Sequence, residues 1–339
     1  MTSRAAVTAS TAWRVPLPSS EMYLRHFGLR EAPFGLTPDT SFFFACTSYQ
    51  EALNTLLVAA RNGEGFIKIT GEVGNGKTLL CRKFLATLNQ GQKATTLIGT
   101  QDQAVDAPSA PRFITAYIPN PYLEPHSLLL ALAEEFRVPL EKDVDQHLLL
   151  KGLTRALLDC ARNGQRALVC LDEAQAMPLE SLEVLRLLTN LETEKRKLLQ
   201  VVLFGQPELN ERLRHHSIRQ LRQRISFQYD LHGLSGDELE RYLRHRLGIA
   251  GFAGETLFTG GAVSKLHRIT GGTPRLVNII AHKALMLAFG EGRQQVLPKH
   301  IRDAAADTPE VRRDWLPWAA VLAGVSVAAS LTVAWMVLQ

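Results

Sequence analysis

The sequence lacks the cysteine patterns of disulfide-rich secreted proteins and of zinc-binding proteins. Among its 339 residues it has only four cysteines, which form no C-x-x-C pair and no metal-binding spacing: Cys46, Cys81, Cys160 and Cys170. Disulfide frameworks and structural zinc sites need paired or regularly spaced cysteines. We therefore expect reduced, mostly buried thiols in a cytosolic compartment.

The N-terminus also lacks the apolar core of a secretory signal peptide. It reads MTSRAAVTASTAWRVPLPSS, in which apolar residues are interspersed with Ser, Thr and Arg. A signal peptide would need a continuous apolar stretch there. Residues 1–21 are therefore expected to be a disordered tail, or an extension ahead of a start at Met22.

Strong net charge is absent as well. The chain has 38 Lys and Arg residues against 33 Asp and Glu residues, a formal charge of +5. This mild excess does not by itself imply binding to nucleic acid. A length of 339 residues leaves room for two domains with a sizeable core. The function must therefore be sought in local motifs.

The most informative segment is GEVGNGKTLL, residues 71–80. It fits the phosphate-loop pattern G-x-x-x-x-G-K-[ST], and it lies between an expected strand over 65–70 and an expected helix over 78–88. In this context glycines let backbone N–H groups turn toward phosphates at a helix N-terminus. The lysine would reach the β- and γ-phosphates, and the threonine hydroxyl would bind Mg²⁺. The residues expected to bind ATP are Gly71, Glu72, Val73, Gly74, Asn75, Gly76, Lys77, Thr78 and Leu79.

An acidic pair follows a second apolar strand. The segment ALVCLDEAQ, residues 167–175, places Asp172 and Glu173 directly after a strand over 167–171. Beside a phosphate loop, Asp172 is expected to hold the Mg²⁺ shell and Glu173 to orient or deprotonate the attacking water. An acidic helix N-cap after a core strand would also fit this pair. The phosphate loop upstream favours the catalytic interpretation.

A third strand is expected over 198–204, and Gln206 follows it. In a parallel sheet this strand would end beside the phosphate loop and the acidic pair. Gln206 is therefore predicted to hydrogen-bond the γ-phosphate or the water, although a turn glutamine before a helix-starting proline remains the alternative. The region between the phosphate loop and the acidic strand is expected to contain a flexible loop over 91–112, a strand over 115–118, and helices over 127–136 and 145–161.

Residues 212–227, RLRHHSIRQLRQRISF, form a basic run. Such a run is typical of a solvated basic face, or of a patch for nucleic acid or acidic lipid. Beside a nucleotide site it can also present an arginine across a subunit boundary to a neighbour's γ-phosphate. We expect Arg224 to be this arginine, with Arg219 as the second choice, in a homo-oligomer that is a ring or a dimer.

Residues 229–308 are expected to form a small helical lid after an α/β domain over 22–228. Ser235 and Glu238 form a capping box at the start of its first helix. Arg275 follows GGTP in the first turn of a later helix, from which it can reach the phosphates and sense hydrolysis. A surface arginine at a helix start is the alternative. The helices are expected over 236–247, 261–269 and 274–289.

A long apolar run lies near the C-terminus. Residues 316–338 contain no charged side chain, and tryptophans lie near both ends of the run. A helix over 315–338 is long enough to span a bilayer with some tilt, whereas a buried helix of a soluble fold is the alternative. Two arginines precede the run and no Lys or Arg follows it. The positive-inside rule then predicts a single-pass protein of the bacterial inner membrane, with its N-terminal bulk in the cytoplasm.

These parts, in this order, resemble the AAA+ ATPases. The amino-acid sequences of several segments resemble one branch of these ATPases, the ExeA/GspA family, and within it the MSHA-pilus biogenesis ATPases of the MshM type. The resemblance covers about residues 22–308 and implies a P-loop NTPase with a parallel sheet core and a small C-terminal helical lid, followed by one transmembrane helix. It rests on MYLRHFGLREAPFGLTPDTSFFF, GEGFIKITGEVGNGKTLLCRKF, AYIPNPYL, LVCLDEAQAMPLESLEVLRLLTNLET, LFGQPEL, RQLRQRI and GGTPRLVNIIAHKAL.

The resemblance also implies roles for individual residues. Asn120, which closes the AYIPN strand, is expected to be the polar residue that restrains the catalytic glutamate. Family members carry a periplasmic peptidoglycan-binding region after the membrane helix. The given sequence ends at Gln339 without such a region, so direct cell-wall binding is not expected. The family's Walker A, Walker B, sensor 1, finger and sensor 2 roles fall on Lys77 and Thr78, Asp172 and Glu173, Gln206, Arg224, and Arg275.

The sequence therefore predicts a membrane-anchored AAA+ ATPase that uses ATP and Mg²⁺ to drive or regulate assembly of a type IV, MSHA-like pilus or a type II secretion machine. Its expected partners are other copies of the chain and inner-membrane proteins of that machine. Nucleic acid is not an expected partner. A DNA-transposition adaptor ATPase shares this core and the basic run, but the C-terminal span and the lack of a separate DNA-binding module argue against it. A nucleotide-gated scaffold with little turnover is the other alternative, and Glu173 argues against that one.

Overall fold

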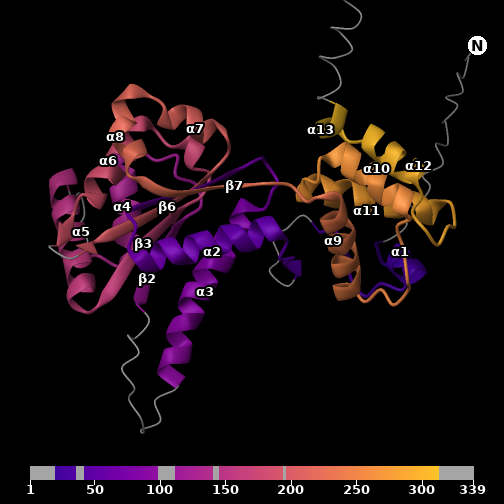
Figure 1. Cartoon of the computed structure of the whole chain (residues 1–339), viewed down its shortest axis with the longest axis horizontal. Coiled ribbons are helices and arrows are strands. Elements are labelled where there is room, and N and C mark those ends of the chain that lie inside the picture. The colour runs from indigo at the N-terminus through magenta and orange to yellow at the C-terminus, as the bar shows by residue number, and fades with distance from the viewer. Residues whose placement is uncertain (1–19, 36–41, 98–110, 140–144, 194–195, 313–339) are drawn as a thin grey trace, which may run out of the picture.

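The part of the chain before the helical domain is built around a parallel β-sheet (Figure 1). The computed structural model describes residues 20–35, 42–97, 111–139, 145–193 and 196–312. Within these residues, a five-stranded sheet has the order β2-β3-β6-β1-β7, and each neighbouring pair is parallel. The predicted α/β fold with a parallel sheet is confirmed. The strands are β1 (Phe66–Gly71), β2 (Arg112–Ile118), β3 (Gln165–Leu171), β6 (Leu199–Gly205) and β7 (Ile225–Leu231).

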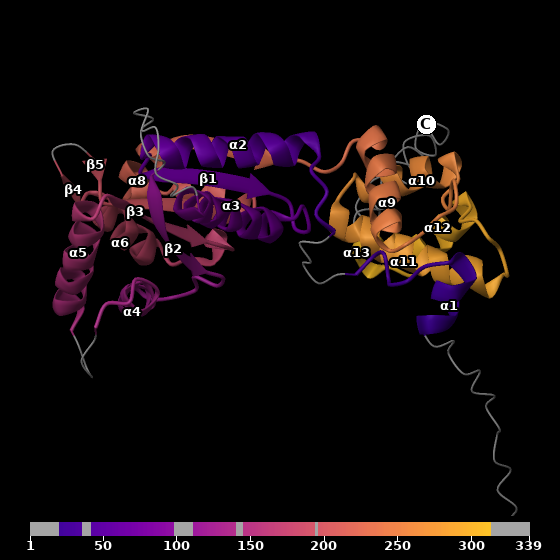
Figure 2. The same cartoon turned by 90° about the horizontal axis from the view of Figure 1, so that it is seen from below.

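Helices cover both faces of this sheet, which explains why its central strands are buried and mostly apolar. Every residue of β1 and of β6 is buried. Along β6, Val202 and Phe204 pack with one cluster of helices, whereas Val201 and Leu203 pack with the other. Figure 2 shows α2 on one side of the sheet and α4 on the other. The first face is covered by α2 (Thr47–Asn62) and α3 (Lys77–Leu97), and the second by α4 (Pro125–Glu135), α5 (Gln146–Arg162) and α6 (Leu179–Thr189).

The expected loop over 91–112 is wrong at both of its ends. Helix α3 continues to Leu97, beyond the expected end at residue 88, and β2 begins at Arg112. Residues 91–97, GQKATTL, include good helix formers, and the single glycine costs only about 1 kcal/mol, so the helix propagates through them. The residues between, 98–110, lie outside the described part of the chain. Several elements had no counterpart among the expected ones, including the antiparallel pair of β4 (Glu192–Thr193) and β5 (Arg196–Lys197) and helix α8 (Arg219–Gln223). Helix α7 (Glu208–Leu213) follows Pro207, the proline at which the alternative for Gln206 expects a helix to start.

The later part of the chain forms a helical domain beside the sheet (Figure 1). The predicted capping box is present at its start, where the Glu238 backbone N–H donates to Ser235 Oγ and the Ser235 N–H donates to the Glu238 carboxylate. The second oxygen of that carboxylate accepts from the backbone N–H of Thr47, at 3.0 Å. This contact joins the helical domain to the start of α2. The domain consists of α9 (Gly236–Ile249), α10 (Gly260–Thr270), α11 (Pro274–Gly290), α12 (Pro298–Ala306) and α13 (Pro309–Arg312).

Helix α1 (Ser20–Phe27) packs against the helical domain, although in sequence it precedes the sheet. Both views show this indigo helix beside the orange and yellow helices (Figures 1 and 2). The Tyr23 ring meets the His282 ring of α11 edge to face, with centroids 5.7 Å apart. The His26 ring nitrogen Nε2 lies 2.9 Å from the backbone carbonyl of Arg293. The chain therefore crosses from the helical domain to the sheet near its N-terminus and returns after β7.

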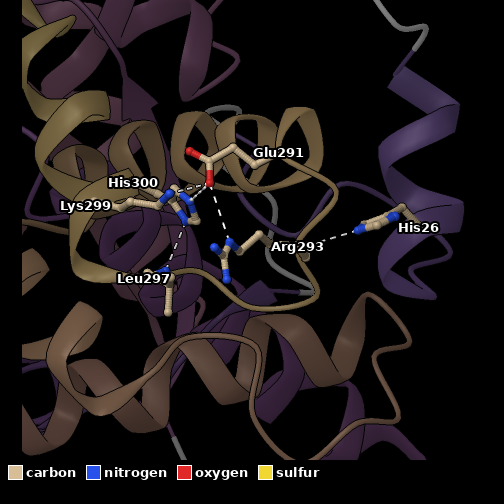
Figure 3. A network of polar contacts seen from close by, with 6 residues as sticks. All are labelled: His26, Glu291, Arg293, Leu297, Lys299 and His300. Carbon is tan, nitrogen blue, oxygen red and sulfur yellow. Dashed lines mark hydrogen bonds and ion pairs between the residues drawn. The ribbon is translucent and has the colours of Figure 1, made fainter.

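The connection between α11 and α12 is held by a carboxylate (Figure 3). Glu291 Oε2 lies 2.5 Å from Lys299 Nζ and 3.2 Å from His300 Nε2. Because His300 Nδ1 accepts from the backbone N–H of Leu297 at 3.0 Å, its Nε2 carries the proton and donates to Glu291. The hydrogen bonds from Lys299 and His300 lower the pKa of Glu291. This network fixes the loop against which His26 of α1 rests.

Two expectations fall on residues that are not described. The transmembrane helix over 315–338 lies in the undescribed residues 313–339, and most of the N-terminal tail lies in residues 1–19. Among the described residues, no helix combines the length and the apolar character needed to cross a membrane.

Candidate nucleotide-binding site

The phosphate loop connects β1 to α3, as the sequence predicts. Gly74 and Gly76 have φ angles of +86° and +83°, in the left-handed region that favours glycine. A Cβ atom at Gly76 would lie 1.6 Å from the Tyr49 hydroxyl oxygen. The loop thus has the backbone form that turns N–H groups inward at a helix start, which suits phosphate oxygens.

Tyr49 of α2 supports this loop through its hydroxyl group, and no sequence pattern indicated this role. Its buried hydroxyl lies 2.7 Å from the carbonyl oxygen of Gly76 and 3.0 Å from that of Asn75. Asn75 is also held, because its side-chain N–H donates to the Leu231 carbonyl at the end of β7. Burial raises the pKa of Tyr49, so the hydroxyl keeps its proton and remains a donor.

Lys77 lies at the first position of α3 with only 5% of its surface exposed. Its Nζ donates to the carbonyls of Gly71 and Glu72, at 2.7 and 3.0 Å. An ammonium has three donors, so one remains for a phosphate oxygen. Burial lowers the pKa of Lys77, and the nearby carboxylates of Glu173 and Asp172 partly offset this shift.

Thr78 and Asp172 are brought together from the loop and from the end of β3. The Thr78 hydroxyl donates to Asp172 Oδ2 at 2.6 Å, and the aspartate is 2% exposed. Burial raises the pKa of Asp172, while the hydrogen bond from Thr78 lowers it. Tyr117 of β2 approaches the same oxygen at 3.4 Å, and burial together with Asp172 raises the pKa of this tyrosine to about 12. A hydroxyl and a carboxylate are the hard oxygen ligands that Mg²⁺ prefers, so the pair fits a magnesium ion.

Glu173 is held by two amide side chains. Its Oε2 accepts from Gln175 Nε2 at 2.5 Å and from Gln206 Nε2 at 3.1 Å. Gln175 Oε1 in turn accepts from the backbone N–H of Gln206, at 3.0 Å. Glu173 also has a φ of +54°, which is uncommon for a non-glycine residue and is found at functional sites. The structure therefore places Gln206 at this carboxylate, and it adds Gln175, which was not among the expected site residues.

Asn120 does not take the place expected for it. Its exposed side chain accepts from the backbone N–H of Tyr122 at 3.3 Å, and no contact with Glu173 is found among the described residues. The amides that touch Glu173 come from Gln175 and Gln206 instead. The spacing D-E-A-Q was the available signal, because an amide two residues after the glutamate can turn back to it.

A pocket of about 290 Å³ lies between the phosphate loop and the helical domain. Arg275 lines it, and the backbone N–H of this residue donates to the Gly74 carbonyl at 3.2 Å. The contact places the start of α11 directly against the phosphate loop. The lining residues from the sheet domain are Cys46, Tyr49, Val73, Gly74, Gly76, Lys77, Thr78, Leu79 and Glu173.

The structure does not bring Arg224 or Arg219 to this pocket. Arg224 is half-buried between α8 and β7, and Arg219 is exposed at the start of α8. Neither lines the pocket, and neither side chain makes an ion pair among the residues described. A contact of Arg224 with phosphate would therefore require a second chain.

The chain is similar to known proteins in sequence and in structure. A family profile described as "AAA domain" matches residues 60–213. General secretion pathway protein A of Aeromonas hydrophila is 40% identical over 291 residues, which cover 86% of this chain and 49% of that protein. The chain thus spans about half the length of this curated relative.

Solved structures show the same fold at low identity. The Aeropyrum pernix ORC2 protein with ADPNP and ADP has a TM-score of 0.53 and 18% identity, covering 76% of this chain and 66% of that one. The Cdc6p protein of Pyrobaculum aerophilum has a TM-score of 0.55 and 16% identity, covering 79% and 71%. Drosophila ORC bound to DNA has a TM-score of 0.56 and 17% identity, covering 91% and 69%. These likenesses establish the architecture alone.

Proposed function

This chain belongs to the ExeA/GspA family of AAA ATPases, and from that premise we propose that it binds and hydrolyses ATP in the service of a type II secretion machine or a related type IV pilus. One observation carries the proposal: Thr78 and Asp172 meet at 2.6 Å beside the buried Lys77. A hydroxyl, a carboxylate and an ammonium in this arrangement suit a metal-bound triphosphate. The matching Aeromonas protein is named for general secretion.

Bound Mg²⁺ and ATP would supply the transferred phosphoryl group and the divalent charge that neutralises it. Lys77 would bind the β- and γ-phosphates with its remaining donor. Thr78 and Asp172 would hold the metal. Glu173 would orient the attacking water and accept its proton, while Gln206 holds the glutamate carboxylate in place.

The site also supports an assembly of several copies. Arg224 lies away from the pocket of its own chain and has no acidic partner among the described residues. An arginine supplied by a neighbouring subunit stabilises the charge that develops during phosphoryl transfer. We therefore propose a homo-oligomer in which Arg224 of one copy completes the site of the next.

The location and partners of the chain are part of the proposal. The uncharged run over 315–338 supports a single membrane-spanning helix, with the ATPase domain in the cytoplasm. The partners would then be inner-membrane proteins of the secretion or pilus machine, with the MSHA-type pilus as the more specific assignment. Likeness to a DNA-bound ORC structure is at the level of fold and does not favour a nucleic-acid partner.

Binding of a fluorescent ATP analogue tests the proposal at its first step. The parent chain should bind the analogue in the presence of Mg²⁺, and Lys77→Ala should lose binding, because Nζ meets the phosphates directly. Lys151→Ala, which removes an exposed lysine from α5, is the matched control and should bind like the parent. Equal binding by all three proteins would show that the loop is not the nucleotide site.

A further inference from the structure

One wall of the pocket is built by the helical domain and by residues just before α2. This wall contains aromatic rings, a leucine, a guanidinium and an amide side chain, and its residues are different from those assigned to the phosphates and the metal. It includes Phe42, Phe44, Leu234, Tyr242, Arg246 and Asn278. An aromatic-lined wall with a few polar groups suits a flat heteroaromatic ring.

A relay of two hydrogen bonds in this wall begins at Arg246 and passes through Tyr242 to Asn278. Arg246 is 8% exposed, its guanidinium lies 4.6 Å from the centre of the Phe42 ring, and its Nε donates to the Pro33 carbonyl. One terminal nitrogen donates to the Tyr242 hydroxyl at 3.0 Å. A guanidinium has donors and no acceptor. The Tyr242 oxygen must therefore be the acceptor in this contact.

The single proton of the Tyr242 hydroxyl is then free to be donated elsewhere. Its acceptor is Asn278 Oδ1, at 2.9 Å. Because a hydroxyl that donates must meet an oxygen, the relay from Arg246 fixes the orientation of the Asn278 amide. The oxygen faces Tyr242, and the nitrogen Nδ2 is left on the other side.

Asn278 lines the pocket and is only 7% exposed. Among the described residues, its Nδ2 has no hydrogen-bond partner, and it is not one of the fully buried unpaired side-chain atoms, so it is accessible from the pocket. A donor of fixed orientation in this position can meet an acceptor on a bound molecule, and loss of that acceptor would weaken binding.

We propose that Asn278 reads the nucleobase, donating from Nδ2 to one ring nitrogen of adenine, and that Arg246 and Tyr242 are positioning residues that hold it in this orientation. The inference rests on the proposed ATP binding and deepens it, since it names the group that recognises the base. Adenine offers ring nitrogens as acceptors at positions 1, 3 and 7. Replacing the correct nitrogen by C–H leaves the donor unpaired and weakens binding.

The test compares the affinity of the full chain for ATP and for its 1-deaza, 3-deaza and 7-deaza analogues. One analogue should bind about tenfold more weakly than ATP, a difference of about 1.4 kcal/mol. Asn278→Leu, which keeps the volume of the side chain and removes both polar atoms, should bind all four nucleotides alike at the weaker level. Tyr242→Phe should also reduce the discrimination, because the amide is then free to turn.

Inorganic tripolyphosphate separates a local effect from a structural one. Its affinity should be unchanged in Asn278→Leu and Tyr242→Phe, because it lacks the base. Tyr229→Phe, which removes a hydroxyl that bonds Ser48 and Glu51 away from the pocket, is the control and should keep full discrimination.

Two outcomes would overturn the inference: equal binding of ATP and all three deaza analogues by the parent chain, or the same discrimination in Asn278→Leu as in the parent. In either case, retained binding of ATP and tripolyphosphate would leave the proposed function intact. If neither ligand binds the parent, the proposed function itself fails.

Discussion

Replacing Gly76 by alanine should destabilise the protein through one identifiable neighbour, Tyr49. The added Cβ would lie 1.6 Å from the tyrosine oxygen and 2.9 Å from the ring carbon that carries it. No flexible chain end lies there that could move aside, because the tyrosine is buried in α2 and bonds the loop carbonyls. The ring must shift, or the loop must.

The magnitude follows from three contributions. A non-glycine residue in the left-handed region costs about 1–2 kcal/mol. Loss of the tyrosine's hydrogen bond to the Asn75 and Gly76 carbonyls costs about 1 kcal/mol. Overpacking around the displaced ring adds about 1–3 kcal/mol. We expect Gly76→Ala to lower the free energy of unfolding by about 3–6 kcal/mol.

A double-mutant cycle isolates the contact. Tyr49→Phe removes the nearest atom, so Gly76→Ala should cost at least about 1 kcal/mol less in that background, as measured by denaturant unfolding. Gly74→Ala is the control, because Gly74 has a similar φ of +86° and its nearest neighbours belong to Arg275 and Thr273. Its cost should be equal in both backgrounds to within about 0.5 kcal/mol. Equal costs of Gly76→Ala in the two backgrounds would refute the reasoning.

Three further predictions concern assembly, anchoring and coupling. Arg224→Ala and Lys77→Ala proteins, each inactive alone, should recover ATP hydrolysis when they are mixed, because a mixed interface pairs an intact phosphate loop with an intact arginine. Such an arginine contributes about 10³–10⁵ to the rate. A mixture that stays inactive despite proven subunit exchange would contradict this prediction. Deleting residues 315–339 should move the protein from the membrane to the soluble fraction, and continued sedimentation with membranes would show that another surface holds it. Arg275→Ala should abolish the ATP-dependent change in protease sensitivity near residues 229–235. The effect on folding should be small, since this arginine is exposed at the start of α11. A protease pattern that still changes with ATP as in the parent would exclude a sensing role.

The features predicted well from sequence are those in which a short segment sets its own geometry. The phosphate loop needs glycine at the positions where φ is positive, and Gly74 and Gly76 meet that need within one segment. The capping box of Ser235 and Glu238 spans four residues and forms as expected. The end of α3 is the counterexample, since residues 91–97 were expected to be loop although they include good helix formers, and α3 continues to Leu97.

The features missed are contacts between residues far apart in the chain. Tyr49 reaches Gly76 across 27 positions, and Tyr242 reaches Asn278 across 36. No local pattern encodes such pairs, because they depend on how α2 and the helical domain meet the sheet. The resemblance assigned the restraint on Glu173 to Asn120, whereas the structure has Gln206, which is 33 positions away and equally hidden from local patterns. Gln175 is the exception, because it lies two positions from Glu173 and the local D-E-A-Q spacing was available to indicate it.

Release of phosphate from ATP by the purified full chain tests the central claim most directly. Glu173→Gln should bind ATP as the parent does and release phosphate at least about 100-fold more slowly, because general-base catalysis contributes about 10²–10⁴ in rate. Glu180→Gln, an exposed change at the start of α6, is the matched control and should retain the parental rate. Phosphate release by Glu173→Gln at the parental rate would contradict the account.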